Sequence, residues 1–509
     1  MQNHVSILSI KKSICPVLLC ALFSLLPLWS ASAQDTGKEE IATSVEEVRQ
    51  QSRPVTLTQA IQIALANNTE IKRSLLTLED ADQQVRIAWS EVMPEITGSA
   101  TYTRNLEIPV NFVPAQFFDP NAPADELVPL QFGTDNNWNG GVSVNQTLFR
   151  GEAIVGISSS KLYKSAQAEN LRATTQQIVT DTRIAYYNVL VAEEQLRLQQ
   201  ATVDRIRQNL RENRSRQEAG LIDEYAVLQV EVQLSNQEPQ LTQAKYAVEQ
   251  AYRELNLRLG LPIEVSLAVQ GDLNRFQIGA ESVADQVNQN IKEVDSMTPY
   301  SYEQQKELVD LATDYRGDIR VLNKQEDLKE REIKAIQSRF LPTLSANYNL
   351  NWSAAQAGSP VFFGSEETRA RSQTLGLTLS LPLFQGFERS ANLQIAKIEQ
   401  KDIRLQQEFA LRSAKNEIQS AREGLNQAIE TAPAREKALK QAREGYNRAQ
   451  ARLSNGIGSQ IDVTEAEFQL RQAEVNYAQM VYNYLSAKAR YDLAVGMVPF
   501  VDKSTPELN

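Results

Sequence analysis

Residues 344–352 read LSANYNLNW, and this stretch sets the first expectation about the fold. Apolar residues occupy every second position, and Ser or Asn occupies each position between them. Successive side chains of a β-strand point to opposite faces, so this alternation predicts a strand over about 343–352 with one apolar face. The apolar set is Leu344, Ala346, Tyr348, Leu350 and Trp352, and the polar set is Ser345, Asn347, Asn349 and Asn351.

Three further stretches show the same alternation, over about 373–382, 95–106 and 138–148. Each has roughly 10 residues, the length that a tilted strand needs to cross a bilayer. A small soluble β-subdomain also fits the alternation alone. Two long segments between the paired strands, 107–137 and 353–372, are rich in Phe or Pro and favour external loops of membrane strands.

Long helices are predicted on either side of these strands. Over 387–455 and again over 152–219, apolar residues recur at alternating spacings of three and four, as in a coiled coil. Shorter helices are predicted over 223–259 and 460–495. A helix of about 68 residues is roughly 100 Å long, so it must pack against other helices along its length.

The chain consists of two tandem copies of one plan. Residues 220–260 align without gaps on residues 456–496, at a constant offset of 236 positions. The predicted organisation is a signal peptide at 1–33, a linker at 34–53, a first repeat at 54–262, an inter-repeat segment at 263–302, a second repeat at 303–498 and a tail at 499–509.

The N-terminus has the pattern of a secretory signal. Lys11 and Lys12 precede an apolar run, and Ala31-Ser32-Ala33 fits the small-residue cleavage pattern. Cys20 suggests a lipid-modified start, but Leu19 stands before it where a small residue is expected. After this segment no apolar stretch approaches ~20 residues, so a membrane-inserted mature chain is expected to use β-strands.

Removal of the signal would leave a chain without cysteine or histidine, because Cys15, Cys20 and His4 all lie within it. We therefore expect no metal site of the usual N/S type, no cofactor, no catalytic residues and no disulfides. The net charge of −11 becomes −13, since the signal has two lysines and no acidic residue. This acidic balance argues against nucleic acid as a partner.

Four membrane strands cannot close a barrel, and an open sheet edge in lipid leaves backbone groups unsatisfied. The chain must then assemble with copies of itself, and two, three or four copies would give 8, 12 or 16 strands. The predicted fold class is α+β but mainly α. In it, two tandem repeats of long coiled-coil helices and a strand pair assemble into an oligomeric transmembrane β-barrel continued by a periplasmic α-barrel.

The ordered repetition of these elements resembles the TolC-like outer-membrane efflux family over about residues 55–498. Leu57-Thr58-Gln59-Ala60-Ile61 and the following Ala64 to Asn68 are similar to that family's N-terminal helix. The resemblance implies a homotrimeric channel subunit in the outer membrane, surrounded by outer-membrane lipid and extending into the periplasm. It also implies a periplasmic adaptor protein and an inner-membrane transporter as partners.

By the same resemblance, Asp462 and Glu465 fall where the family has acidic rings that narrow the periplasmic entrance. Carboxylates repeated around a pore favour cations. The two residues also resemble a helix-start capping pair, which needs no pore. Their first-repeat counterparts are Ala226 and Gln229, so any acidic ring comes from one repeat.

The two helix–turn–helix tips resemble the turns that family members offer to adaptors. The alternative for them is ordinary turn chemistry, with Gly supplying a positive φ. The candidate contact residues are Ala219, Gly220, Leu221, Asn455, Gly456 and Ile457.

Two other classes of protein are possible from the sequence. A periplasmic coiled-coil scaffold or adaptor would have the same helices, with the strands in a soluble domain. An enzyme could draw on the many Asp and Glu residues, but no phosphate-binding loop or nucleophile motif is present.

Overall fold

The computed structural model describes residues 55–118, 127–271 and 302–501, together with positions 120, 123, 125 and 273. All of them belong to one compact unit, Ser52–Asn509. The predicted signal peptide and linker lie outside the described residues, as do most of the inter-repeat segment and of the C-terminal tail.

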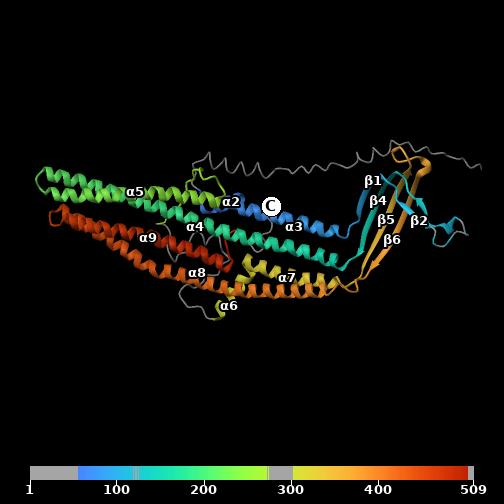
Figure 1. The fold of residues 1–509 in the computed structure, drawn as a ribbon. Coiled ribbons are helices and arrows are strands. Elements are labelled where there is room, and N and C mark those ends of the chain that lie inside the picture. The colour runs from blue at the N-terminus through green and yellow to red at the C-terminus, as the bar shows by residue number, and fades with distance from the viewer. Residues whose placement is uncertain are drawn as a thin grey trace, which may run out of the picture. The chain divides into compact units, whose positions relative to one another are not determined.

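The first half of the chain folds into helices, strands and a long helical hairpin (Figure 1). The first of the described helices begins at a capping box, in which the Thr56 hydroxyl accepts from the Gln59 N–H and the Gln59 side-chain oxygen accepts from the Thr56 N–H. The elements are α2 (Leu57–Asn67), α3 (Thr69–Ser90), β1 (Glu95–Arg104), β2 (Val110–Pro114), η2 (Ala115–Phe117), β3 (Leu127–Gln131), β4 (Asn136–Phe149), α4 (Gly151–Glu218) and α5 (Glu224–Leu259).

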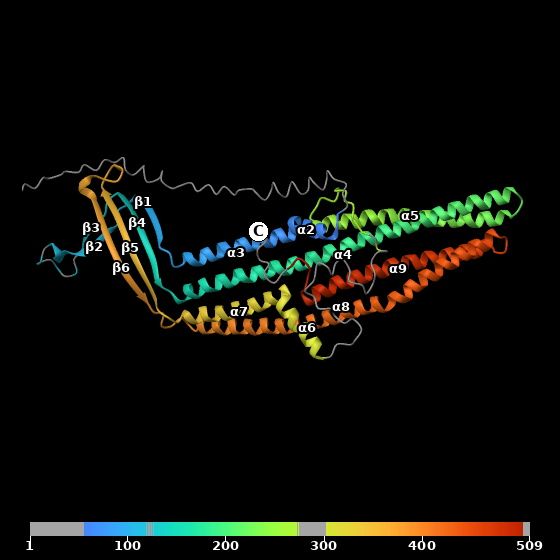
Figure 2. The ribbon, with the colours of Figure 1, turned by 180° about the vertical axis from the view of Figure 1, so that it is seen from behind.

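The second half repeats this order, with two strands and a second long hairpin (Figure 2). Both hairpins end where a glycine takes a left-handed conformation, at Gly260 after α5 and at Gly496 after α9. The elements are α6 (Tyr302–Tyr315), α7 (Gly317–Ser338), β5 (Thr343–Gln356), η5 (Glu366–Thr368), β6 (Arg369–Ser380), α8 (Glu388–Ser454) and α9 (Gln460–Val495).

The four predicted strands form one antiparallel sheet in the order β1-β4-β5-β6. Each half contributes a strand pair, and the central β4–β5 pairing joins the halves through partners such as Ser143 and Asn349. Alternate residues form an apolar face, with the row Ile96–Val144–Tyr348–Leu375, and a polar face, with the row Thr97–Ser143–Asn349–Thr374. The predicted mainly helical α+β fold of two repeated halves is confirmed.

The segment expected to be a loop between the first two strands contains structure of its own. Strands β2 and β3 pair as a separate hairpin, with Phe112 opposite Pro129. The alternation is hard to see in the sequence because Pro114 and Pro129 stand within the strands. Proline is tolerated there because a two-stranded hairpin has free edges.

Helix α4 lies at the centre of the helical region and packs against α3, α5, α7 and α9. Its contact with α7 is close at Gly317, where an added Cβ would lie 2.4 Å from the backbone N of Ala173. Only glycine fits at that crossing. No helix in the described part of the chain is both long enough and apolar enough to cross a membrane.

Candidate functional site

The two long hairpins reverse direction through turns of nearly identical geometry. Gly220 and Gly456 have φ of +71° and +75°, a region that residues with a Cβ rarely adopt. The N–H of Leu221 and that of Ile457 each donate to the carbonyl five positions earlier, at 2.9 Å and 3.0 Å. This bonding explains the turns as helix endings. The six candidate contact residues are all exposed in these turns: Ala219, Gly220, Leu221, Asn455, Gly456 and Ile457.

Asp462 caps its own helix. Its carboxylate accepts a 3.0 Å hydrogen bond from the N–H of Ser459, and the Ser459 hydroxyl accepts from the N–H of Asp462 at 3.2 Å. The hydrogen bonds with Ser459, helped by the nearby charge of Arg452, hold the pKa of Asp462 below its usual value. The carboxylate is exposed and stays ionised to lower pH than an ordinary aspartate.

Glu465 takes no part in this cap. Its carboxylate accepts a hydrogen bond from the Gln469 side chain at 2.8 Å and is exposed to solvent. The alternative that Asp462 and Glu465 form a capping pair is therefore wrong. The helix begins after Ser459, so the capping partner of Asp462 is Ser459. The two carboxylates lie on the first turns of α9, next to the tip.

Apolar side chains beside the tip form a groove that sequence reasoning missed. Tyr225, Leu228 and Val232 follow one another along α5 at spacings of three and four, and all three are exposed. With Ile461 of α9 they line a groove of about 470 Å³. The spacing itself was a detectable signal, since apolar residues at these intervals share one helix face.

Glu467 is a buried carboxylate between the two hairpins, with 3% of its surface exposed. It accepts hydrogen bonds from Arg205 of α4 at 3.1 Å and from Gln233 of α5 at 3.3 Å. Burial raises the pKa of Glu467 against the opposing effect of Arg205. The Arg205 guanidinium also lies 5.8 Å from the centroid of the Tyr446 ring of α8. This cluster therefore connects the four helices of the two hairpins.

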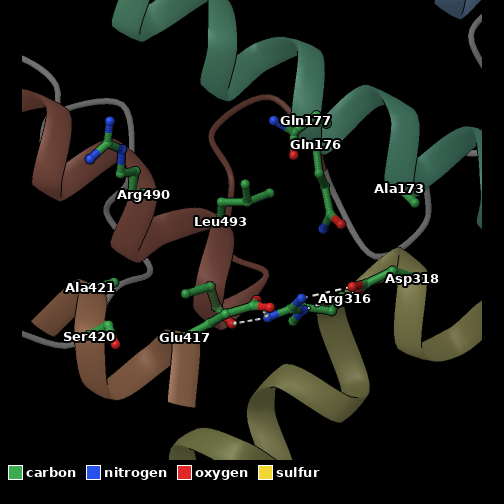
Figure 3. Close-up of a pocket in the computed structure, with 11 residues that line it drawn as sticks. Ala173, Gln176, Gln177, Arg316, Asp318, Glu417, Ser420, Ala421, Arg490 and Leu493 are labelled. Atoms are coloured by element: carbon green, nitrogen blue, oxygen red, sulfur yellow. Dashed lines mark hydrogen bonds and ion pairs between the residues drawn. The ribbon is translucent and has the colours of Figure 1, made fainter. Parts of the chain in front are cut away.

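A cavity of about 650 Å³ lies where α4, α8 and α9 meet the α6–α7 junction (Figure 3). Arg316 projects into it and pairs with Asp318 and Glu417, each at 2.7 Å. Burial alone would raise the pKa of Asp318. The hydrogen bond from Arg316 outweighs that effect and holds this pKa below its usual value. These paired charges join the junction to α8.

The polar face of the sheet carries almost no charge. Along the four strands this face presents Asn, Ser and Thr, with Glu95 as its one ionisable side chain within the strand bounds. The opposite face exposes large apolar side chains, among them Ile96, Leu375 and Leu377. A sheet with one exposed apolar face and one hydrated face suits a wall between lipid and an aqueous passage.

These features define the class of an outer-membrane channel subunit, in which a strand wall continues into long helical hairpins. The chain belongs to the family of outer membrane efflux proteins, whose sequence model matches residues 60–261 and 308–497. The predicted family resemblance is thereby confirmed. The protein is an efflux or secretion channel subunit of the outer membrane, with a helical extension into the periplasm.

Individual relatives agree with this assignment. The chain is 24% identical over 365 residues to the alkaline protease secretion protein AprF of Pseudomonas aeruginosa, covering 71% of this chain and 70% of AprF. It is 22% identical over 457 residues to the outer membrane protein TolC of Escherichia coli K12, covering 87% and 83%. The fold is similar to the crystal structure of the Campylobacter jejuni CmeC outer membrane channel, with a TM-score of 0.67, 20% identity and coverage of 87% and 85%.

Proposed function

We propose that three copies of this chain close a 12-stranded barrel and form a passive conduit across the outer membrane and periplasm. The observation that carries this proposal is the four-stranded sheet, in which β1 and β6 each have a single partner. Their outer edges leave backbone groups unpaired, and lipid cannot satisfy such groups. Pairing β6 of one copy with β1 of the next continues the antiparallel alternation and removes both free edges of the four-stranded sheet.

The helical tips would face the partners of the conduit. The exposed turns around Gly220 and Gly456 would contact a periplasmic adaptor protein, which joins the channel to an inner-membrane transporter. The groove beside Leu228 gives a helical partner an apolar surface close to both turns. The name of AprF associates that relative with protease secretion, so we propose a role in a multi-component efflux or secretion system.

Asp462 and Glu465 would narrow the entrance as acidic rings. Both carboxylates are exposed near the tip, and threefold symmetry would repeat each of them around the axis. Such rings favour cations and repel anions. In this proposal the protein conducts cargo and catalyses no reaction.

Engineered disulfides test the ring. Both cysteines of the chain lie within residues 1–33, so the rest of the chain is a cysteine-free background. We would place one cysteine on β1 (Ser99→Cys) and scan the second along β6 (Ser372→Cys, Thr374→Cys or Thr378→Cys). At least one pair should link three chains covalently in outer-membrane fractions.

The control pair, Ser143→Cys with Asn349→Cys, joins residues that are direct partners within one sheet and should link no second chain. A periplasmic scaffold is the competing function. Recovery of the protein without detergent, with no interchain crosslink at any scanned position, would favour the scaffold and refute the channel ring.

A further inference from the structure

Three arginines occupy one rim of the apolar face of the sheet, at the end farthest from the helices. Arg104 is the last residue of β1, and Arg369 is the first residue of β6. Arg371 lies directly opposite Trp352. All three side chains are exposed. On this face, the guanidinium groups therefore lie just beyond the band of apolar side chains that includes Leu375 and Leu377.

Aromatic rings hold two of these arginines at that level. The Arg371 guanidinium lies 5.9 Å from the Trp352 ring centroid, and that of Arg369 lies 5.7 Å from the Phe363 ring centroid. Arg369 also donates to the carbonyls of Phe363 at 2.8 Å and Gly364 at 3.0 Å. Aromatic side chains of membrane strands collect at the interface between the apolar core and the headgroups. In a membrane wall the three charges would therefore lie at headgroup depth.

Within the described part of the chain, no acidic side chain pairs with this group. Among the described residues, none of Arg104, Arg369 and Arg371 forms an ion pair, although Glu366 and Glu367 are close in sequence. At the opposite end of the sheet Arg150 is paired with Glu91, and Arg339 with Glu152. Arg389, also near that end, has no ion pair within the described residues and donates instead to the carbonyls of Arg339 and Pro382. Within the strands, the arginines without an acidic partner all lie at the far rim of the apolar face.

We propose that this rim binds the phosphate of an anionic membrane lipid. The inference rests on the proposed ring, in which β6 of one copy lies beside β1 of the next. That pairing would bring Arg369 and Arg371 next to Arg104 of the neighbouring copy, on the same face and at the same end. Three guanidinium groups would then meet at each seam, and a phosphate supplies several acceptor oxygens for their donors. The lipid would act as a link between subunits.

Native mass spectrometry of detergent-solubilised protein tests the proposal. Wild-type trimers are offered phosphatidylglycerol, which is anionic, or phosphatidylcholine, which is zwitterionic. We expect retention of phosphatidylglycerol only, with about fivefold weaker binding for each arginine replaced by glutamine. Arg371→Lys should retain much of the binding, whereas Arg339→Gln at the opposite end is the control and should bind as wild type does.

Three results would overturn the lipid site. These are equal retention of the two lipids by wild type, unchanged binding in the triple glutamine variant, and displacement of the lipid by millimolar inorganic phosphate, which would indicate a free-anion site. If the triple variant fails to assemble, the single variants Arg371→Gln and Arg104→Gln decide the question. Absence of trimers in wild type would refute the ring itself, whereas lipid-free trimers would refute only the lipid site.

Discussion

The side-chain amide of Gln176 donates a 2.9 Å hydrogen bond to the carbonyl of Gly496, joining the middle of α4 to the residue that ends α9. The same amide donates to the carbonyl of Tyr315 at 2.9 Å, and its oxygen accepts from the N–H of Gly317 at 3.0 Å. Gln176 is buried, with 3% of its surface exposed. One side chain of the first half therefore satisfies three backbone groups of the second half.

Replacement of this glutamine should destabilise the helical region. Gln176→Leu leaves buried backbone groups without partners, so we expect the free energy of unfolding to fall by about 2–4 kcal/mol. Urea denaturation followed by circular dichroism measures the change. The neighbouring Gln177→Leu removes an exposed side chain that donates to Asp181, and it should change stability by less than about 0.5 kcal/mol. Equal effects of the two substitutions would contradict a bridging role for Gln176.

Glu467 should make stability depend on pH. Since its pKa is raised by burial, the folded state holds this proton more tightly than the unfolded state does. Ionised Glu467 lowers stability at neutral pH, and this effect fades as the pH falls through the raised pKa toward the ordinary value of 4.5. Glu467→Gln should therefore raise Tm at pH 7. The difference in Tm between this variant and wild type should become smaller as the pH is lowered.

The exposed Glu465→Gln is the control and should leave Tm at pH 7 close to that of wild type. A Glu467→Gln variant whose Tm follows wild type in parallel from pH 7 to pH 5 would show that this carboxyl does not titrate as expected.

The two tip carboxylates should set the ion preference of the entrance. We expect Asp462→Ala with Glu465→Ala to raise single-channel conductance and weaken cation selectivity in planar bilayers, because two negative charges per subunit are removed. Ser459→Ala separates the charge from the helix cap, since it breaks the cap but leaves both carboxylates. If Ser459→Ala changes selectivity as much as the double variant does, the cap and not the charge is responsible.

The sheet offers a complementary test, because its polar face is nearly uncharged. Asn349→Asp places a carboxylate in the middle of that face in each of the three copies. Each should interact by roughly 0.4 kcal/mol with an ion about 10 Å away in water, so we expect cation selectivity to rise by up to about eightfold. Asn349→Ser keeps the face neutral and should leave the reversal potential unchanged. No shift with Asn349→Asp would indicate that this face does not line the passage.

Local patterns made much of the fold predictable. The alternation around Tyr348 and the leucines of 373–382 reflect one apolar face of the sheet, which the chain encodes residue by residue. The seam of each long helix is encoded in the same way. Glu467 stands at a seam position between Val463 and Leu470, so a buried charge was visible in principle. The sequence did not indicate its partners, Arg205 of α4 and Gln233 of α5.

The rest of the site depends on contacts between distant segments. Arg183 and Asp492 form a buried ion pair at 2.7 Å, although 309 positions separate them. No periodicity relates two such positions, because only the packing of α4 on α9 brings them together. The Ser459 cap was missed for another reason. Both Ser459–Asp462 and Asp462–Glu465 have the spacing of a capping pair, and the backbone of the turn decides between them.

The central β4–β5 seam has a consequence for the origin of the chain. This seam joins two similar hairpins inside one polypeptide, just as β6 and a neighbouring β1 would join two hairpins of separate polypeptides. A half-length ancestor could have closed the same wall as a hexamer. Duplication and fusion of its gene would then have allowed the two halves to diverge, so that only the second has carboxylates at the positions of Asp462 and Glu465.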